Sequence, residues 1–250
     1  MALPHSFGKI LLFSLLPVAA MVLGSLIAAF RVPGAAWRSA ILHFAAGVVF
    51  SVVAVELLPD IIKRHAPLEV AIGFALGVGA MLGLRVLSGG EEKAEAGEAT
   101  EPAGKTPFPT GLLFGVGVDI FVDGLLLGIG FAAGAKEGTL LALALATELL
   151  SLGLATSAAL GRAGISRGKN VAVNAALSLS FFVAAMGGAT LLSHLSGEWL
   201  ELVLSFGLAA LLFLVTEELL TEAHEEEETP LLTLAFFGGF LLFLLLGMAL

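Results

Sequence analysis

Long apolar stretches alternate with short polar breaks along the whole chain. Eight of these stretches are long enough to cross a bilayer as a helix, which takes roughly 20 mainly apolar residues. Breaks such as RVPG and KRHAP contain glycine, proline and charge, and they are short enough to impose tight antiparallel hairpins. We therefore predict an all-α integral membrane protein with eight transmembrane helices, at residues 9–30, 36–62, 67–87, 109–134, 138–161, 168–195, 198–222 and 230–250.

The composition agrees with this pattern. Of the 250 residues, 58% are hydrophobic and 13% are charged, whereas a soluble domain has about 25% charged residues. We expect one transmembrane domain spanning residues 1–250. The apolar stretch at 9–30 is longer than the apolar core of a signal peptide, so we interpret it as the first span.

The polar segment at residues 88–108 is the one long break, and its Gly, Glu, Ala and Pro content predicts a flexible loop. Lys and Arg set the orientation, because cytoplasmic loops carry an excess of them. With the N-terminus outside, eight of these residues face inward and four outward. We therefore expect a multi-pass protein of the cell (inner) membrane with both termini outside and the 88–108 loop in the cytoplasm. The eight inward residues are Arg31, Arg38, Arg85, Lys93, Lys105, Arg162, Arg167 and Lys169.

Three carboxylates interrupt two of the apolar stretches. Asp119 and Asp123 lie in the 109–134 span and Glu148 lies in the next, each about ten to fifteen residues from the start of its helix and so near the midplane. A charge at that depth costs about 2.5 to 3.5 kcal/mol on insertion scales. Neither span has a Lys or Arg near its middle. The neutralising species must come from outside, as protons or as a metal ion.

The spacing of the three residues allows them to face one another. Asp119 and Asp123 are four apart, so they lie on one face of their helix and repel each other. Glu148, on the following antiparallel helix, can face them. Either a divalent cation or protonation would relieve the repulsion. A purely structural role would suit one such residue better than three.

Two segments of the chain resemble each other. VVAVELLPD (52–60) closes the second predicted span and LVTEELLTE (214–222) closes the seventh, with Glu56 aligned with Glu218. Because the two spans enter the membrane in opposite senses, this predicts an inverted repeat around the fourth and fifth spans. Inverted repeats place a substrate site at the midplane between the halves. Chance similarity between Leu-rich helix ends is the alternative.

Other polar residues are weaker candidates for cation binding. Glu218 and Glu222, with Glu56 and Asp60 at the end of the second span, are candidates for vestibules that gather cations, and Glu217 is a further candidate near the interface. Solvated helix ends are the alternative interpretation. His43 is a candidate ligand or a packing residue. A polar stripe in the sixth span faces either a pore or a hydrogen-bonding neighbour helix. This stripe consists of Asn170, Asn174 and Ser178.

The sequence also excludes several classes of function. It has no cysteine, hence no disulfide or thiolate metal site. It has no nucleotide-binding loop, no Ser/His/Asp set and no zinc-protease motif, so we do not expect an enzyme or a tightly bound cofactor. A net charge of −9 argues against nucleic acid or anionic lipid as a partner.

On these features the chain resembles the ZIP (Zrt/Irt-like protein) family of divalent metal transporters over nearly its whole length. HFAAGVVFSVVAVELLPD (43–60) and EELLTEAH (217–224) look like that family's second and seventh spans. The family's HNxPEG motif matches DIFVDG here, so Asp119 takes the place of His and Asp123 that of Glu. Its second motif matches ELLSLG, with Glu148 at the first ligand position and Leu152 at the second.

The resemblance implies a 3+2+3 helix bundle that moves zinc, iron, manganese or a similar cation by alternating access, and a possible homodimer. Departures from the motifs predict at most one ion at Asp119, Asp123 and Glu148. The all-oxygen ligand set shifts preference from zinc toward manganese, iron(II), magnesium or calcium. A proton-coupled carrier of another small solute and a non-transporting scaffold or sensor remain open alternatives.

Overall fold

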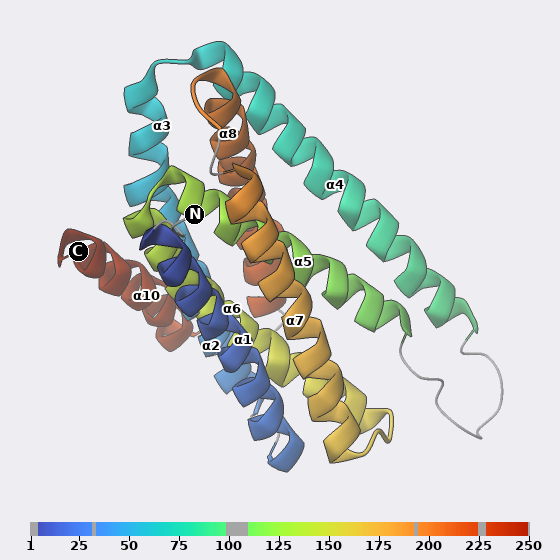
Figure 1. Ribbon diagram of the computed structural model, residues 1–250. Helices are drawn as coiled ribbons and strands as arrows, with labels where there is room; N and C mark the ends of the chain where they lie inside the picture. The colour runs from blue at the N-terminus through green and yellow to red at the C-terminus, as the bar shows by residue number, and fades with distance from the viewer. Residues whose placement is uncertain (1–4, 32–33, 99–109, 193–194, 225–228, 250) are drawn as a thin grey trace.

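The computed structural model describes residues 5–31, 34–98, 110–192, 195–224 and 229–249, and these residues form helices with no strand among them (Figure 1). Two short π-helical segments, η1 and η2, interrupt the second and seventh spans. In chain order the elements are α1 (His5–Phe30), α2 (Ala35–Val52), η1 (Val53–Leu57), α3 (Leu58–Arg64), α4 (Pro67–Glu98), α5 (Thr110–Ala133), α6 (Ala135–Arg162), α7 (Arg167–Leu192), α8 (Glu198–Phe213), η2 (Leu214–Leu219), α9 (Leu220–Ala223) and α10 (Pro230–Ala249).

Eight helices within the described ranges are long and apolar enough to cross a membrane, which confirms the predicted number of spans. Their ends lie close to the predicted ones; for example, the first span runs over Gly8–Phe30 and the fifth over Ala135–Arg162. The second span consists of α2, η1 and α3, and the seventh of α8, η2 and α9. The chain is therefore a multi-pass, all-helical membrane protein.

Helix α4 is longer than the sequence pattern predicted. It continues to Glu98, well into the segment 88–108 that we expected to be a loop. The reason is local: the EEKAEAGE stretch is rich in Glu, Ala and Lys, which favour helix, and contains no proline. The rest of that predicted loop lies outside the described residues.

The helices pack in matched pairs. Helix α1 packs against α6, and α5 packs against α7; in the same way α2 packs against α10, and α4 against α8. In Figure 1, α4 lies along one edge of the bundle and α10 along the opposite edge. The inverted repeat would exchange spans 1–3 with spans 6–8, and span 4 with span 5. This exchange converts the α1–α6 pair into the α7–α5 pair, and the α2–α10 pair into the α8–α4 pair. This exchange of partners supports the inverted repeat that the sequence predicted.

Glycines make the same pairings close. A side chain at Gly24 of α1 would overlap the backbone carbonyl of Leu150 on α6, and one at Gly153 of α6 would overlap that of Met21. In the related pair, Gly124 of α5 lies against the carbonyl of Phe181 on α7. Small residues let membrane helices approach to backbone contact, which replaces the hydrophobic driving force that lipid does not provide.

The two π-helical segments lie at matching positions of the two halves. Segment η1 contains Glu56 and η2 contains Glu218, the two residues that the internal alignment places together. A π turn adds one residue to a helical turn and so changes which side chains face the bundle afterwards; such turns are frequent at functional sites. Glu56 and Glu218 are therefore presented by the same unusual backbone in both halves.

The local causes of the two π segments differ. Pro59, just after η1, has no N–H to offer the carbonyl of Val55, and its ring crowds that carbonyl, so a wider turn relieves the clash. After η2 the hydroxyl of Thr221 donates to the carbonyl of Thr216, at 3.4 Å, and supplies a hydrogen bond to an oxygen of the widened turn. Different residues thus produce the same backbone feature.

We predict that Gly124→Ala destabilises the protein by about 1–3 kcal/mol, because the added methyl group forces α5 away from α7. The matched control is Gly115→Ala on the same helix, where a methyl group meets open space. That change should be neutral or stabilising by up to about 1 kcal/mol, since alanine favours helix over glycine. Thermal unfolding of both variants in the same detergent measures the difference, and equal melting temperatures would contradict the packing argument.

Candidate functional site

Two of the three predicted site residues are buried at the junction of α5 and α6. Asp123 on α5 is 1% exposed and Glu148 on α6 is 4% exposed. The two carboxyl groups interact electrostatically, on helices that pack against each other. Asp123 Oδ2 and Glu148 Oε2 have no hydrogen-bond partner among the described residues. The fold therefore buries two acidic groups whose hydrogen-bonding capacity is only partly used by described residues.

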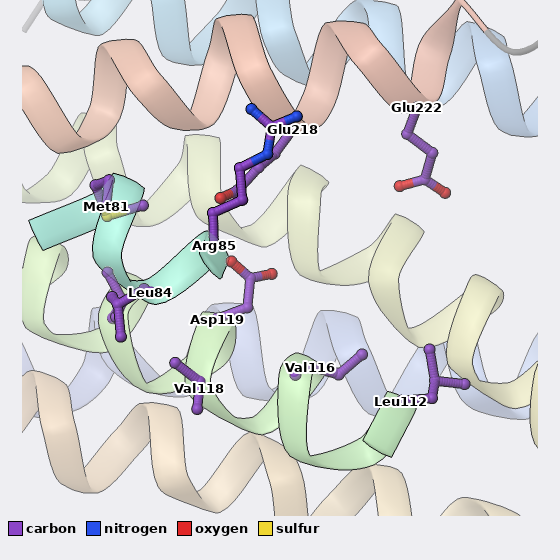
Figure 2. A pocket seen from close by; sticks show the side chains of 11 residues that line it. Met81, Leu84, Arg85, Leu112, Val116, Val118, Asp119, Glu218 and Glu222 are labelled. Carbon is purple, nitrogen blue, oxygen red and sulfur yellow. The ribbon is translucent and has the colours of Figure 1, made fainter. Parts of the chain in front are cut away.

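Asp119, the third predicted residue, lies one helical turn from Asp123 and is half-buried. Its side chain lies within hydrogen-bonding range of Glu218 on η2, and Figure 2 shows the two approaching each other from opposite helices. Two carboxyl groups can hydrogen-bond only if one of them carries a proton. Asp119 also interacts electrostatically with Glu148. Glu148 interacts electrostatically with Glu218 and Glu222 as well, and Asp123 with Glu218, so the buried pair, Asp119 and the acids of the seventh span form one electrostatic cluster.

A cavity of about 380 Å³ opens beside Asp119, between α4, α5 and the end of the seventh span. We call it the acidic cavity, because Asp119, Glu218 and Glu222 line it (Figure 2). Arg85 of α4 lies at its wall, and the remaining lining is mainly apolar. The carboxyl groups therefore form a series from Glu222 through Glu218 and Asp119 to the buried pair.

Asp119, Asp123 and Glu148 form no ion pair with any described basic residue. The pairs that do form surround these three groups. Arg38 binds Glu222 at 3.2 Å, and Arg85 binds Glu217. On the other side of the bundle, Lys136 binds Glu56 at 3.2 Å, and Arg64 binds both Asp60 and Glu201 at 3.0 Å. Of these basic residues, Arg85 also lines the acidic cavity, where it interacts electrostatically with Glu218.

These pairs change the picture of the predicted vestibules. Of the residues proposed for them, Glu56, Asp60 and Glu222 have a basic partner, and so does the neighbouring Glu217. Glu218 contacts Asp119 and also interacts electrostatically with Arg85. Sequence reasoning missed Glu201, which is 6% exposed and bound to Arg64. Its position in the first turn of an apolar span is the sequence signal that could have identified it.

Hydrogen bonds use most of the polar atoms in the stripe of α7. Asn170 donates to the carbonyl of Ser157 on α6 at 2.8 Å. Asn174 donates to Asn170, and Ser178 donates to the carbonyl of Ala175. The Oδ1 atom of Asn174 alone has no partner in the described structure. The hydrogen bond of Asn170 joins α7 to α6, whereas those of Asn174 and Ser178 stay within α7, and the ligand role expected for the stripe stays a prediction.

His43 has a packing environment as well. It is buried, its Nδ1 lies 2.8 Å from the carbonyl oxygen of Ser39, and its ring meets that of His224 edge to face at 5.2 Å between centroids. The hydroxyl of Ser39 in turn donates to the carbonyl of Ala223. His43 thus joins the start of α2 to the end of the seventh span.

In the part of the chain that the structure describes, no group of three or more His, Cys, Asp or Glu side chains is arranged to hold one metal ion. The carboxyl groups are gathered along a path and not closed around a point. An ion bound between Asp123 and Glu148 in this arrangement would need water or backbone oxygens to complete its coordination, because Mg²⁺- or Ca²⁺-like ions take six or more oxygen ligands.

We predict that the double variant Asp123→Asn/Glu148→Gln is more thermally stable than the native protein, by about 1–3 kcal/mol, because it removes two buried acidic groups whose oxygens lack partners. Unfolding in detergent without added metal measures this. As a control, Glu201→Gln breaks a partly buried ion pair with Arg64 and should lower stability. A double variant that is less stable than the native chain would show that the two acids have compensating partners.

Comparison with known protein families finds no match over this chain, and comparison with curated proteins finds no match either.

Proposed function

We propose that this protein is a secondary transporter that carries a small divalent metal cation across the membrane. The observation that supports this most is the pair of acidic groups Asp123 and Glu148, buried at mid-membrane without a basic partner among the described residues. The acidic cavity provides the approach to them through Glu218 and Asp119. We further propose the cell membrane as its location, with both termini outside, from the distribution of Lys and Arg.

The chemistry of the path suits a cation better than an anion or a neutral solute that moves alone. Negative groups in a low-dielectric interior repel one another, and a positive species between them removes that repulsion. An anion would add to it. A neutral solute would leave the cost of the buried acids uncompensated. The cation would exchange with protons on the same carboxyl groups, so that the path is never left with its full negative charge.

The oxygen ligands favour hard or borderline divalent ions, such as manganese or iron(II), over ions that prefer thiolate or imidazole. Zinc stays within the proposed class, because carboxylates also bind it. We propose that Asp119, Asp123 and Glu148 bind the ion in turn or together as α5 and α6 move, with water completing the coordination.

The ion pairs around the site provide the two ends of an alternating-access cycle. Lys136–Glu56 and Arg64–Glu201 tie elements together at one end, and Arg38–Glu222 and Arg85–Glu217 do so at the other. We propose that opening one end breaks one set of pairs while the other set holds. The Arg38–Glu222 and Arg85–Glu217 pairs are partly exposed, and each is worth at most about 1 kcal/mol, so breaking them does not block movement. The Arg64–Glu201 pair has a buried glutamate and costs more to break.

The direct test is metal uptake into liposomes that contain the purified protein. Asp123→Asn should reduce uptake of manganese or iron(II) at least about tenfold, because loss of one charged ligand costs about 1.5–3 kcal/mol of binding. The matched control is Glu137→Gln, which also removes a carboxylate from the α5–α6 region but at the first turn of α6, near the membrane surface. Undiminished uptake by Asp123→Asn would contradict the proposal.

A second candidate is a proton-coupled carrier of another small solute, in which the acids form a proton relay. The contact between Asp119 and Glu218 favours it, since such a pair shares a proton. Here we expect proton movement into metal-free liposomes along an imposed pH gradient, lost in Glu218→Ala, and no metal in the purified protein by mass spectrometry. Metal bound in the native protein and absent from Asp123→Asn would favour the metal carrier. If neither metal nor protons move into the liposomes, the result would favour the scaffold or sensor role.

A further inference from the structure

A second cavity, of about 570 Å³, lies where α1 and α6 end and α7 begins. Its lining includes Phe30 from the last turn of α1, Arg162 from the last turn of α6, and Arg167 and Asn170 from the first turn of α7. We call it the basic cavity. It shares no lining residue with the acidic cavity, and the proposed transport path does not use it.

The basic cavity lies at the membrane boundary. The first span ends at Phe30, the fifth ends at Arg162 and the sixth begins at Arg167. Three spans thus change from apolar to polar at this one place, which is the level of the lipid headgroups. Phe30 itself is 74% exposed, as a side chain in contact with lipid would be.

The charge of the basic cavity is positive and uncompensated. Arg162 and Arg167 line it, and its described lining contains no Asp or Glu. Neither arginine forms an ion pair with a described residue. This differs from the acidic region, where Arg38, Arg64 and Arg85 each bind a carboxylate. The two cavity arginines therefore have their donor groups available for a ligand.

The geometry of Arg167 is suited to an anion with several oxygens. Its guanidinium group lies over the ring of Phe30, 5.4 Å from the ring centroid, so the aromatic contact uses the flat face of the group. The N–H donors lie at the edge of the guanidinium plane and stay free, in the forked arrangement that matches phosphate.

The first turn of α7 contributes in the same direction, whereas the C-terminal ends of α1 and α6 at this cavity present carbonyl groups, and the two arginines outweigh these. Helix α7 begins at Arg167, and the first N–H groups of a long helix have no partner within it, which makes a helix N-terminus a natural phosphate site. Asn170, 2% exposed, fixes this turn by donating to the carbonyl of Ser157 on α6. The first turn of α7 is thus held rigidly against the cavity.

From these observations we propose that the basic cavity binds the phosphate group of an anionic phospholipid, with Arg162 and Arg167 as its ligands and Phe30 beside the lipid. With the predicted orientation this is the cytoplasmic leaflet, where basic pockets between transmembrane helices bind such headgroups. The net charge of −9 does not oppose this, because salt screens charges beyond about 10 Å and the local arginines decide.

The test measures lipid binding to the purified full-length protein by native mass spectrometry, with phosphatidylglycerol and phosphatidylcholine compared at equal concentration. We expect the native chain to prefer phosphatidylglycerol, and Arg162→Gln/Arg167→Gln to lose at least about tenfold in affinity for it. The matched control is Lys169→Gln, which removes an exposed positive charge two residues from Arg167 but outside the cavity lining. It should bind like the native protein. Circular dichroism verifies that each variant is folded.

Competition with inorganic phosphate identifies the source of the phosphate group. If millimolar phosphate leaves the bound lipid in place, the ligand is the phospholipid. If phosphate displaces it, and the same two arginines are required, the cavity is a site for a free phosphate group. Equal affinity for both lipids, an unchanged double variant, or an equal loss in Lys169→Gln would each overturn the proposal.

Discussion

Two acidic side chains buried in the middle of a membrane bundle, Asp123 and Glu148, impose the main constraint on this protein. Burying such groups without a basic partner is costly, and an oxygen of each lacks a hydrogen bond within the described structure. Close packing of α5 on α7, made possible at Gly124, holds Asp123 in place despite this cost. Helix packing thus offsets the free-energy cost of these two buried acids. Proteins commonly accept such a local cost at functional sites.

The scaffold is nearly symmetric, whereas its charges are not. Both halves present a glutamate on a π-helical segment, Glu56 in one and Glu218 in the other. Glu56 is bound to Lys136 of α6, but Glu218 meets another acid, Asp119 of α5. Both ends carry ion pairs, and the end with Glu218 also has the acidic cavity. An alternating-access cycle needs such a difference between its two ends in any one state.

Positive charge is separated from the acidic region at the α1–α6–α7 end. There Arg162 and Arg167 line a cavity without carboxylates in its described lining, at the level where three spans end. Arginines elsewhere in the bundle neutralise the surroundings of the acids. The same residue type thus takes part in internal ion pairs and, in our proposal, in contact with lipid, according to which helix ends are neighbours.

The sequence by itself determined the eight spans and predicted three acidic site residues, two of which, Asp123 and Glu148, the structure buries. Both follow from local hydropathy: a run of some 20 apolar residues has few options besides crossing a membrane, and an acid inside it is conspicuous. Only the tertiary structure decided that Glu218 joins Asp119, that Glu56 and Glu201 have basic partners, and that Arg162 meets Arg167 at a cavity. Such pairings depend on how each helix is rotated and how closely it packs, and contacts between residues far apart in the chain set both.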